Sequence, residues 1–560
     1  MKENCRSGEI LPLVSAATAA ALDAQVHAEW GFNPYALIEA AGRNCAQVFR
    51  NAFPAFFNCV PVSGSAEDGS ARTRTPKITV AAGKGNNGAD AMVMLRYWLL
   101  TGQADPDHST LVLGSLPPND DTSPRAELVK SLKKMKVPVL VWDEDVNSAV
   151  HSGSNGIFSQ SDIIVDGIAG TGLKGPLHGS ALEMVSAINA HSQFRIPHSA
   201  FINRPFIVSV DIPSGNFDHW EPGMPIVDAD CTLAIEPLKY CLYTPAGRPH
   251  AGVILPVKNI FPRSLVDACE GAKLLDWESA GKRIPRIRPD AHKNTRGTVE
   301  IRAGSPGASG AALIAARGAQ AAGAGLIRLT VDDEIYPVLA AQAAGIMVSP
   351  GGGESAGCFE GRFRPDAVLL GPGWGTNPQR AAIVKKAMTL EQEGVALVLD
   401  ADALPFARGL CFSGRTILTP HPGELEKFTG VERNSLLAHP APVLLRFAKE
   451  CNAVILFKGH VLTIAAPDGR LAVIDGMAPG LAAGGSGDLL AGFCAAIAAR
   501  VSREDRNFDA YTCAAAAAAL LISSAKDKTI AGRFTDPLEV AHVAANLAGE
   551  AWLGKDYLYG

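Results

Sequence analysis

Short runs of β-branched and aliphatic residues recur along the chain, and most of them end in Gly, Asp or Asn before a helical stretch begins. Residues 77–81 precede a glycine-rich loop, residues 162–165 precede Asp166, and residues 206–210 precede Asp211. Apolar runs of this length that alternate with helices are typical of parallel strands buried on both faces. Ligands of such folds bind beyond the carboxyl ends of the strands, so the polar residues there are candidate site residues.

The same alternation restarts after a stretch near 269–289 that carries Lys, Arg and Pro without a clear period. We therefore predict two α/β domains, at 10–262 and 285–555, joined by a linker at 263–284. Residues 61–75 are rich in Ser, Gly and charge and are expected to form an inserted surface loop. The strands expected in the second domain lie at 298–301, 326–330, 367–370, 395–399, 416–419 and 454–457.

Composition narrows the class of protein. The net charge of −5 and the absence of a basic block argue against nucleic-acid binding. The 11 cysteines are scattered with no CxxC pair, which suits a reducing compartment and indicates no zinc site. The start of the chain is polar, so no signal peptide is expected. Residues 510–525 form the longest uncharged run, which is too short for a membrane span and predicts a buried helix. We expect a cytoplasmic protein with no membrane partner.

The most informative motif is Gly484-Gly485-Ser486-Gly487-Asp488, which is followed directly by an apolar run. Glycines let backbone N–H groups approach an anion, and the helix that follows directs its positive end at the same point. An aspartate there suits removal of a proton from a hydroxyl beside a phosphate that is being transferred. The alternative is a glycine-rich turn with an N-capping aspartate.

Three loops at successive strand ends of the first domain carry further polar groups. The loop at 83–90 has two Asn at its centre and differs from the GxGxxG dinucleotide fingerprint. Such a loop suits a phosphate, a ribose or a cation, or else an Asx-turn before a helix. Asp166 begins a glycine-rich loop, and Asp211 begins Asp211-Ile212-Pro213-Ser214-Gly215. Either aspartate alone would more often be a helix cap, but the three loops together indicate one site.

Residues 10–262 resemble the NAD(P)H-hydrate epimerase domain, a Rossmann-like three-layer α/β fold. The family loop G-x-G-N-N-G-G-D-G is followed by D-x-x-x-G-T-G and D-I-P-S-G, and residues 37–43 are similar to its L-M-E-x-A-G-R helix. The resemblance implies that Asp211 is the acid/base catalyst and contacts the substrate. It also implies a potassium ion held by Asn87, Asp166 and Ser214. The hydrated dinucleotide would be bound by Asn86, Asn87, Gly88, Ala89, Asp90, Gly170, Thr171, Gly172, Leu173, Lys174, Gly175 and Pro176.

Two positions depart from the family loop, because Ala89 and Ala91 stand where the family usually has Gly. If either position requires a positive φ, alanine would strain the loop. If the glycine serves close approach instead, the extra methyl group would crowd the substrate. The departures therefore bear on epimerase activity more than on the fold.

The second domain carries its own strand-end motifs, at 371–375, 399–404, 419–424, 458–460 and 484–488. With His292-Lys293, they resemble a ribokinase-like α/β fold and, more narrowly, the ADP- or ATP-dependent NAD(P)H-hydrate dehydratases. Ser486 replaces the Thr of the family's G-G-T-G-D and keeps its hydroxyl. The resemblance implies that Mg²⁺ accompanies the nucleotide and that Asp488 is the catalytic base. It assigns the nucleotide to Lys458, Gly459, His460, Val461, Leu462 and Gly487, and the hydrated dinucleotide to Ala311, Gly373, His421 and Asp488.

The combined hypothesis is a bifunctional repair enzyme for hydrated NADH and NADPH. One half would interconvert the R and S epimers, and the other would dehydrate the S epimer at the expense of ADP or ATP. The alternative is a ribokinase-like vitamin kinase fused to a dinucleotide-binding module without chemistry. The expected partners are small molecules; the sequence leaves the nucleotide preference and homo-oligomer formation open, because no motif or coiled-coil pattern decides them.

Overall fold

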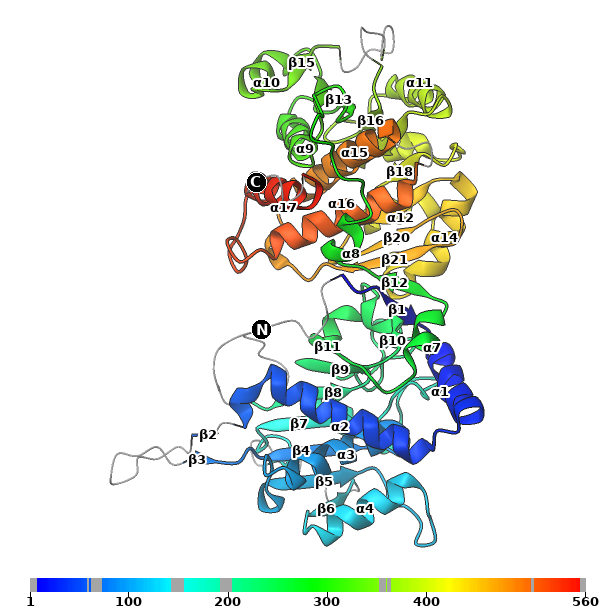
Figure 1. Ribbon diagram of the computed structural model, residues 1–560, viewed down its shortest axis with the longest axis vertical. Coiled ribbons are helices and arrows are strands. Elements are labelled where there is room, and N and C mark those ends of the chain that lie inside the picture. The colour runs from blue at the N-terminus through cyan, green and yellow to red at the C-terminus, as the bar shows by residue number, and fades with distance from the viewer. Residues whose placement is uncertain are drawn as a thin grey trace, which may run out of the picture. The chain divides into compact units, whose positions relative to one another are not determined.

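The chain divides into two compact units, Leu11–Gly271 and Ala272–Gly560 (Figure 1). The computed structural model describes residues 8–57, 60–61, 73–142, 156–191, 204–351, 359, 364–504 and 508–553. The division falls inside the stretch 263–284, which is folded and contains α7 (Arg263–Ala268), β12 (Ala272–Leu274) and α8 (Trp277–Gly281). Most of the loop expected at 61–75 lies outside the described residues.

The first unit is built on a seven-stranded parallel sheet in the order β11-β9-β8-β7-β4-β5-β6. From β4 the chain first moves outward through β5 and β6, then returns to β7 and moves outward on the other side. The topological switch therefore lies between β4 and β7, where this class of sheet binds its ligands. The strands are β4 (Ile78–Ala82), β5 (Ser109–Leu113), β6 (Val139–Val141), β7 (Ile163–Gly167), β8 (Phe206–Val210), β9 (Cys231–Ile235) and β11 (Val253–Val257).

Helices cover both faces of this sheet and give three layers. Ile78 and Val80 of β4 pack with α2, α3 and α4, whereas Ala81 faces the opposite layer with α6. This alternation follows from the two-residue period of a strand. The elements around the sheet are β1 (Leu11–Val14), α1 (Ala16–Trp30), α2 (Pro34–Ala52), β2 (Val60–Pro61), β3 (Thr73–Arg74), α3 (Asn86–Leu100), α4 (Pro124–Lys134), α6 (Gly179–Asn189) and β10 (Leu238–Lys239).

The motif at 37–43 explains how α2 meets α3. Gly42 lies at the crossing, where an added Cβ would stand 2.5 Å from the Cβ of Val93. Only glycine allows so close an approach of the two helices. Glu39, from the same motif, forms an ion pair with Arg96 of α3. The motif thus fixes α2 against the helix that begins at the Asn-Asn loop.

The second unit is built on a mostly parallel sheet, in which β19–β20 and β20–β21 are the antiparallel pairs among its described strands. Its strand order is β12-β21-β20-β19-β18-β17-β16-β13-β14-β15, so the chain reverses direction between β13 and β16. All six strands expected here are confirmed. The strands are β13 (Thr298–Arg302), β14 (Leu326–Thr330), β15 (Met347–Ser349), β16 (Ala367–Leu370), β17 (Ala396–Leu399), β18 (Thr416–Leu418), β19 (Val454–Phe457), β20 (Val461–Ala465) and β21 (Leu471–Asp475).

Helices again form a layer on each face of this sheet. One layer packs α8, α9, α15, α16 and α17 into a single core, and the other packs α11, α12 and α14. The buried helix expected at 510–525 is confirmed as α16. Within the described residues, no helix has the length and apolar character needed to cross a bilayer. The helices are α9 (Ser309–Ala321), α10 (Tyr336–Gln342), α11 (Arg380–Gln392), α12 (Pro422–Thr429), α13 (Arg433–Ala438), α14 (Pro440–Cys451), α15 (Ser486–Glu504), α16 (Ala510–Ala525) and α17 (Pro537–Trp552).

Small residues bring α9 and α15 into close contact. An added Cβ at Gly492 of α15 would stand 2.1 Å from the carbonyl oxygen of Ala315, and one at Gly318 of α9 would stand 2.7 Å from that of Leu489. The alanine-rich character of α9 therefore serves a helix–helix contact. This contact holds the N-terminal turn of α15, which carries Asp488, against the sheet.

We expect Gly492→Ala to destabilise the second unit by about 1–3 kcal/mol, because the new methyl group must push α9 and α15 apart. Gly549→Ala is the matched control, since its Cβ would meet only Leu553 Cδ1, at 3.8 Å. That substitution should stabilise α17 by about 0.5–1 kcal/mol, the usual gain of alanine over glycine in a helix. Thermal unfolding followed by circular dichroism measures both shifts. Equal midpoints for the two variants would contradict the close-packing account.

Candidate active sites

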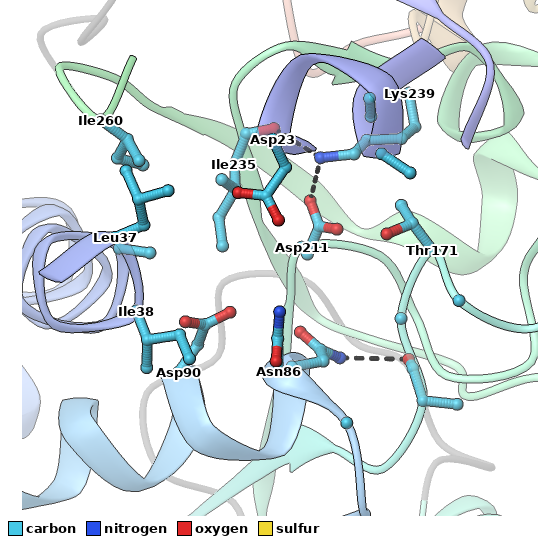
Figure 2. Close-up of a pocket in the computed structure, with 18 of the residues that line it drawn as sticks. Asp23, Leu37, Ile38, Asn86, Asp90, Thr171, Asp211, Ile235, Lys239 and Ile260 are labelled. Carbon is cyan, nitrogen blue, oxygen red and sulfur yellow. Dashed lines mark hydrogen bonds and ion pairs between the residues drawn. The ribbon is translucent and has the colours of Figure 1, made fainter. Parts of the chain in front are cut away.

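A cavity of about 550 Å³ lies at the topological switch of the first unit (Figure 2). The loops after β4 and β7 form one side, and Asp211, which follows β8, contributes a carboxylate. Helices α1 and α2 and the segment around β10 close the opposite side. Its described lining is Ala19, Ala20, Asp23, Pro34, Leu37, Ile38, Ala41, Lys84, Gly85, Asn86, Asn87, Asp90, Ile168, Ala169, Gly170, Thr171, Gly172, Leu173, Asp211, Ile235, Glu236, Pro237, Lys239, Ile260 and Phe261.

A buried ion pair dominates this cavity. Lys239 Nζ lies 2.5 Å from Asp211 Oδ1 and donates a second hydrogen bond, of 2.9 Å, to the carbonyl oxygen of Ile235. The side chains of Lys239 and Asp211 are only 4% and 11% exposed, so water screens their charges weakly. Asp211 also has a φ of 65°, a left-handed conformation that is uncommon outside glycine. Strain of this kind is typical of functional positions.

Two other carboxyl groups share the space around Asp211. Burial raises the pKa of Asp90 well above its usual value, and the neighbouring charge of Asp211 raises it further. Burial also raises the pKa of Asp23, against the opposing effects of His27 and Lys239. Figure 2 shows Asp23, Asp90 and Asp211 facing the same cavity. A carboxyl that stays protonated beside one that is ionised is an arrangement suited to acid–base chemistry.

The structure separates the residues expected to bind the dinucleotide into two groups. Asn86, Asn87 and Asp90 line the cavity, as do residues 170–173. Gly88 and Ala89 are buried within α3, and residues 174–176 do not border the cavity. Gly88 serves packing, because an added Cβ would lie 2.6 Å from the carbonyl oxygen of Gly83.

Ala89 and Ala91 do not strain the loop. Both lie in α3 and are buried in the core, and neither has a positive φ. Neither side chain borders the cavity, so the extra methyl groups do not occupy substrate space. Ala91 instead packs against Gly167 of β7. A Cβ added at Gly167 would lie 2.6 Å from the Cβ of Ala91.

Asp166 and Ser214 form a buried polar cluster beside the cavity. The Ser214 hydroxyl donates to Asp166 Oδ1 at 2.5 Å, and the Ser214 backbone N–H donates to Asp166 Oδ2 at 2.9 Å. Asn87 donates to the carbonyl oxygen of Ala169, but its buried Oδ1 accepts no hydrogen bond from any described residue. Burial raises the pKa of Asp166, against the lowering effect of these hydrogen bonds. An unpartnered amide oxygen next to a carbonyl and a hydroxyl fits an alkali cation.

A second buried lysine–aspartate pair lies at the carboxyl ends of the strands in the second unit. Lys458 Nζ, after β19, lies 2.5 Å from Asp400 Oδ1, after β17. The Thr419 hydroxyl, after β18, donates to the same oxygen at 2.6 Å. Burial acts to lower the pKa of Lys458, but the carboxylates around it, led by Asp400, outweigh burial and raise it. Lys458 therefore remains a cation, suited to holding a phosphate oxygen.

Asp488 lies in the first turn of α15, close to this pair. An added Cβ at the preceding Gly487 would stand 3.5 Å from Lys458 Nζ, so the ammonium group lies against this turn. Burial and the charge of Asp400 raise the pKa of Asp488 to about 6, although Lys458 opposes the shift. A carboxylate with a pKa near neutrality is suited to removing a proton from a hydroxyl.

Ala311 lies in the first turn of α9, Gly373 in the loop after β16, and His421 at the N-cap of α12. Gly373 has a φ of 54°, and an added Cβ there would lie 2.8 Å from the Cβ of Ala311, so these two residues are in contact. His421 caps α12 through its Nδ1, which accepts the N–H of Gly423 at 3.0 Å. Its side chain is half exposed and also faces Glu424.

The stretch 458–462 runs from the turn after β19 into the first residues of β20. Gly459 and His460 are exposed, whereas Val461 and Leu462 are buried strand residues. The side chains of these last two residues therefore belong to the core, and they can meet a nucleotide only through the backbone. This outcome reflects the antiparallel β19–β20 hairpin, which returns the chain into the sheet immediately after the turn.

Lys239 and Asp23 are site residues that the sequence reasoning missed. Lys239 comes four residues after the end of β9, within Glu236-Pro237-Leu238-Lys239. A cation just beyond an apolar strand was a signal that could have found it. Asp23 lies in the middle of α1, where a lone acidic residue resembles any exposed helix position.

The two units together define an enzyme class with one buried carboxylate–lysine pair in each unit, beyond the carboxyl ends of the strands. Residues 34–241 match the family model described as YjeF-related protein N-terminus, and residues 299–542 match the model described as NAD(P)H-hydrate dehydratase. The Rossmann-like α/β fold expected for the first unit is confirmed, and the second unit is confirmed as an α/β fold with a mostly parallel sheet.

Similar proteins span both units. A bifunctional NAD(P)H-hydrate repair enzyme of Moorella thermoacetica is 29% identical over 87% of this chain and 88% of its own length. One of Thermofilum pendens is 30% identical over 75% of this chain and 78% of its own length. An ADP-dependent (S)-NAD(P)H-hydrate dehydratase of Xanthomonas campestris pv. campestris is 36% identical over 39% of this chain and 77% of its own length. The chain belongs to the family of the bifunctional NAD(P)H-hydrate repair enzymes.

We expect Asp488 to titrate near pH 6, well above an ordinary aspartate, because it is buried beside Asp400. Infrared difference spectra of protein with ¹³C-labelled aspartate, recorded against Asp488→Asn, follow this carboxyl group directly. Asp400→Asn removes the like charge and should move the titration to lower pH. The exposed Asp468→Asn is the control and should leave it in place. A titration of Asp488 near pH 4 in the wild type would contradict the account.

Proposed function

We propose that this chain repairs hydrated NADH and NADPH in two steps. The first unit epimerises the R and S hydrates at C6 of the nicotinamide ring, and the second dehydrates the S form with ADP or ATP. The observation that carries the proposal is the position of Asp488, a base with a pKa of about 6 beside the Lys458 ammonium group. A hydroxyl base and a phosphate-binding cation are the two groups that phosphorylation of an alcohol requires.

In the second unit, Asp488 removes the proton of the C6 hydroxyl. The hydroxyl oxygen then attacks the terminal phosphorus of the nucleotide, and the bond from that phosphorus to its bridging oxygen breaks. Inorganic phosphate leaves C6 of the resulting ester, and loss of a C5 proton restores the ring double bond. Phosphate is a much better leaving group than hydroxide, so the nucleotide drives the loss of water.

The nucleotide is placed by the strand-end loops of the second unit. Lys458 supplies the positive charge, and the backbone N–H groups at the start of α15 point toward the same phosphate. Mg²⁺ would neutralise the remaining phosphate charge. ADP is the first donor to test, because the Xanthomonas relative is named for ADP.

A potassium ion is proposed for the first unit. The unpartnered Oδ1 of Asn87 is the group that would gain most from a cation, with the Ser214 hydroxyl and the Asp166 carboxylate beside it. Bound there, the ion would fix the loops after β4 and β7, which carry Asn86 and Thr171 into the cavity.

For the epimerase, the purified protein should convert the R hydrate of NADH to the S hydrate without any nucleotide. Asp211→Ala should lose this conversion, because it removes the acid/base group and leaves Lys239 without its counter-ion. Chromatography of the two epimers measures the rate above the uncatalysed background. Failure of the wild type to convert would favour a first unit that binds a dinucleotide without chemistry.

For the dehydratase, Asp488→Ala should keep nucleotide binding and lose the recovery of NADH from the S hydrate. General base catalysis is worth about 10²–10⁴-fold, so the loss should be at least of that order. Absorbance of NADH follows the reaction, and calorimetry with ADP or ATP follows binding. Full activity in this variant would refute the role of Asp488, and Asp211→Ala is the control that should leave this step intact.

A further inference from the structure

We propose that Asp90 and Asp211 act as an acid and a base on the same hydrated ring, and that Lys239 is the positioning residue that holds Asp211 through their ion pair. The inference rests on the proposed epimerase function and adds the proton donor that this reaction requires. It is drawn from the cavity of the first unit, which all three side chains line (Figure 2).

Asp211 has the geometry of a base. Its Oδ1 is held by the ammonium group of Lys239 at 2.5 Å, whereas its Oδ2 makes no hydrogen bond to any described residue. The Lys239 side chain is 4% exposed, and a buried ammonium group is stable only with a counter-charge. The ion pair with Lys239 therefore occupies Oδ1, and Oδ2 is the oxygen that can accept a proton from a substrate.

Asp90 has the surroundings of an acid. It is 7% exposed and lies in the first turns of α3, where its carboxyl group makes no hydrogen bond or ion pair to the described part of the chain. Burial, and then the charge of Asp211, raise the pKa of Asp90 well above its usual value. Lys239 acts to lower this pKa but does not outweigh burial, so the protonated form of Asp90 is favoured and can donate its proton into the cavity.

The two groups together can open and close the hydrated ring. Asp211 takes the proton of the C6 hydroxyl as Asp90 gives its proton to N1, and the bond between N1 and C6 breaks to leave an aldehyde at C6. Rotation about the C5–C6 bond presents the other face of the aldehyde. N1 then attacks C6, Asp90 recovers the proton from N1, and Asp211 returns its proton to the oxygen. No other reactant is consumed.

The remaining ionisable groups near Asp211 leave this assignment in place. Asp23 of α1 is a further carboxyl group beside the cavity. Burial raises its pKa, and the nearby charge of Lys239 acts to lower it. Burial raises the pKa of the Cys45 and Cys241 thiols, so both stay neutral. Glu236 is held by the backbone N–H groups of Ile260 and Phe261. Lys84 also lines the cavity, with no hydrogen bond or ion pair to the described residues.

The test compares Asp90→Asn, Lys239→Met and Lys239→Arg in the full chain, with the R hydrate as substrate and no nucleotide. Asp90→Asn should lower kcat by about 10²-fold or more with little change in KM, because the amide keeps the shape and cannot donate the proton in the same way. Lys239→Met should move the acidic limb of the pH–rate profile to higher pH, with activity regained as pH rises. Lys239→Arg retains the positive charge, so the acidic limb of its pH–rate profile should stay at the same pH as in the wild type.

The outcomes separate this inference from the proposed function. Each variant is also assayed for dehydration of the S hydrate with ADP or ATP, which should stay at the wild-type rate and shows that the second unit is folded, and thermal unfolding by circular dichroism checks the first unit. A wild type without epimerase activity overturns the proposed function and this inference with it. An active wild type with unchanged Asp90→Asn kinetics, or Lys239→Met activity lowered equally at all pH values, overturns the acid–base assignment alone.

The ring-opening step has its own test. In water enriched in ¹⁸O, ring opening keeps the original oxygen on C6 of the S product. Departure of hydroxide and return of water would instead place one solvent oxygen on C6 in each turnover. Mass spectrometry of the product within the first turnovers distinguishes the two results, and incorporation of solvent oxygen would overturn the ring-opening step.

Discussion

A buried lysine that neutralises a strand-end aspartate is the interaction on which both sites depend. In the first unit Lys239 holds Asp211, and in the second Lys458 holds Asp400, each at 2.5 Å. Removing one partner of such a pair leaves an uncompensated charge in a nonpolar surrounding, which is strongly unfavourable. The two pairs nevertheless have different uses. Lys239 supports a carboxylate that faces the substrate cavity, whereas Asp400 supports an ammonium group next to the turn that carries Asp488.

The sheets explain why these pairs form where they do. In each unit the chain starts near the middle of the sheet, moves outward in one direction and then returns to build the other side. In the first unit the strand ends beside this reversal leave room for the cavity, whereas the pair of the second unit lies after β17 and β19, farther along its sheet. Polar residues at the strand ends, far apart in the sequence, are thereby brought to one place. Glycines such as Gly42 and Gly492 then allow the helices that carry Asp90 and Asp488 to pack closely enough to hold them there.

Much of this could be predicted from the sequence, because apolar strands that end in polar loops are a local signal. The strands of the second unit, the buried helix at 510–525 and the carboxylates of Asp90, Asp211 and Asp488 were visible in that way. Lys239 and Asp23 were missed because their roles arise from tertiary contacts, through β10 and α1, that no local pattern encodes. The burial of Val461 and Leu462 was missed for a related reason, since a motif does not reveal that its last residues have already entered a strand. The effect of Ala89 and Ala91 could be judged only once both were placed inside α3.

The left-handed backbone of Asp211 limits what evolution or design can do at this position. Glycine or asparagine would tolerate the φ of 65°, but neither carries the negative charge that Lys239 requires. Glutamate carries the charge, but it adopts this conformation with difficulty and its longer chain would displace the carboxylate. The backbone conformation thus excludes glutamate, and the need for a negative charge excludes glycine and asparagine. Aspartate is the one amino acid of the twenty that meets both demands.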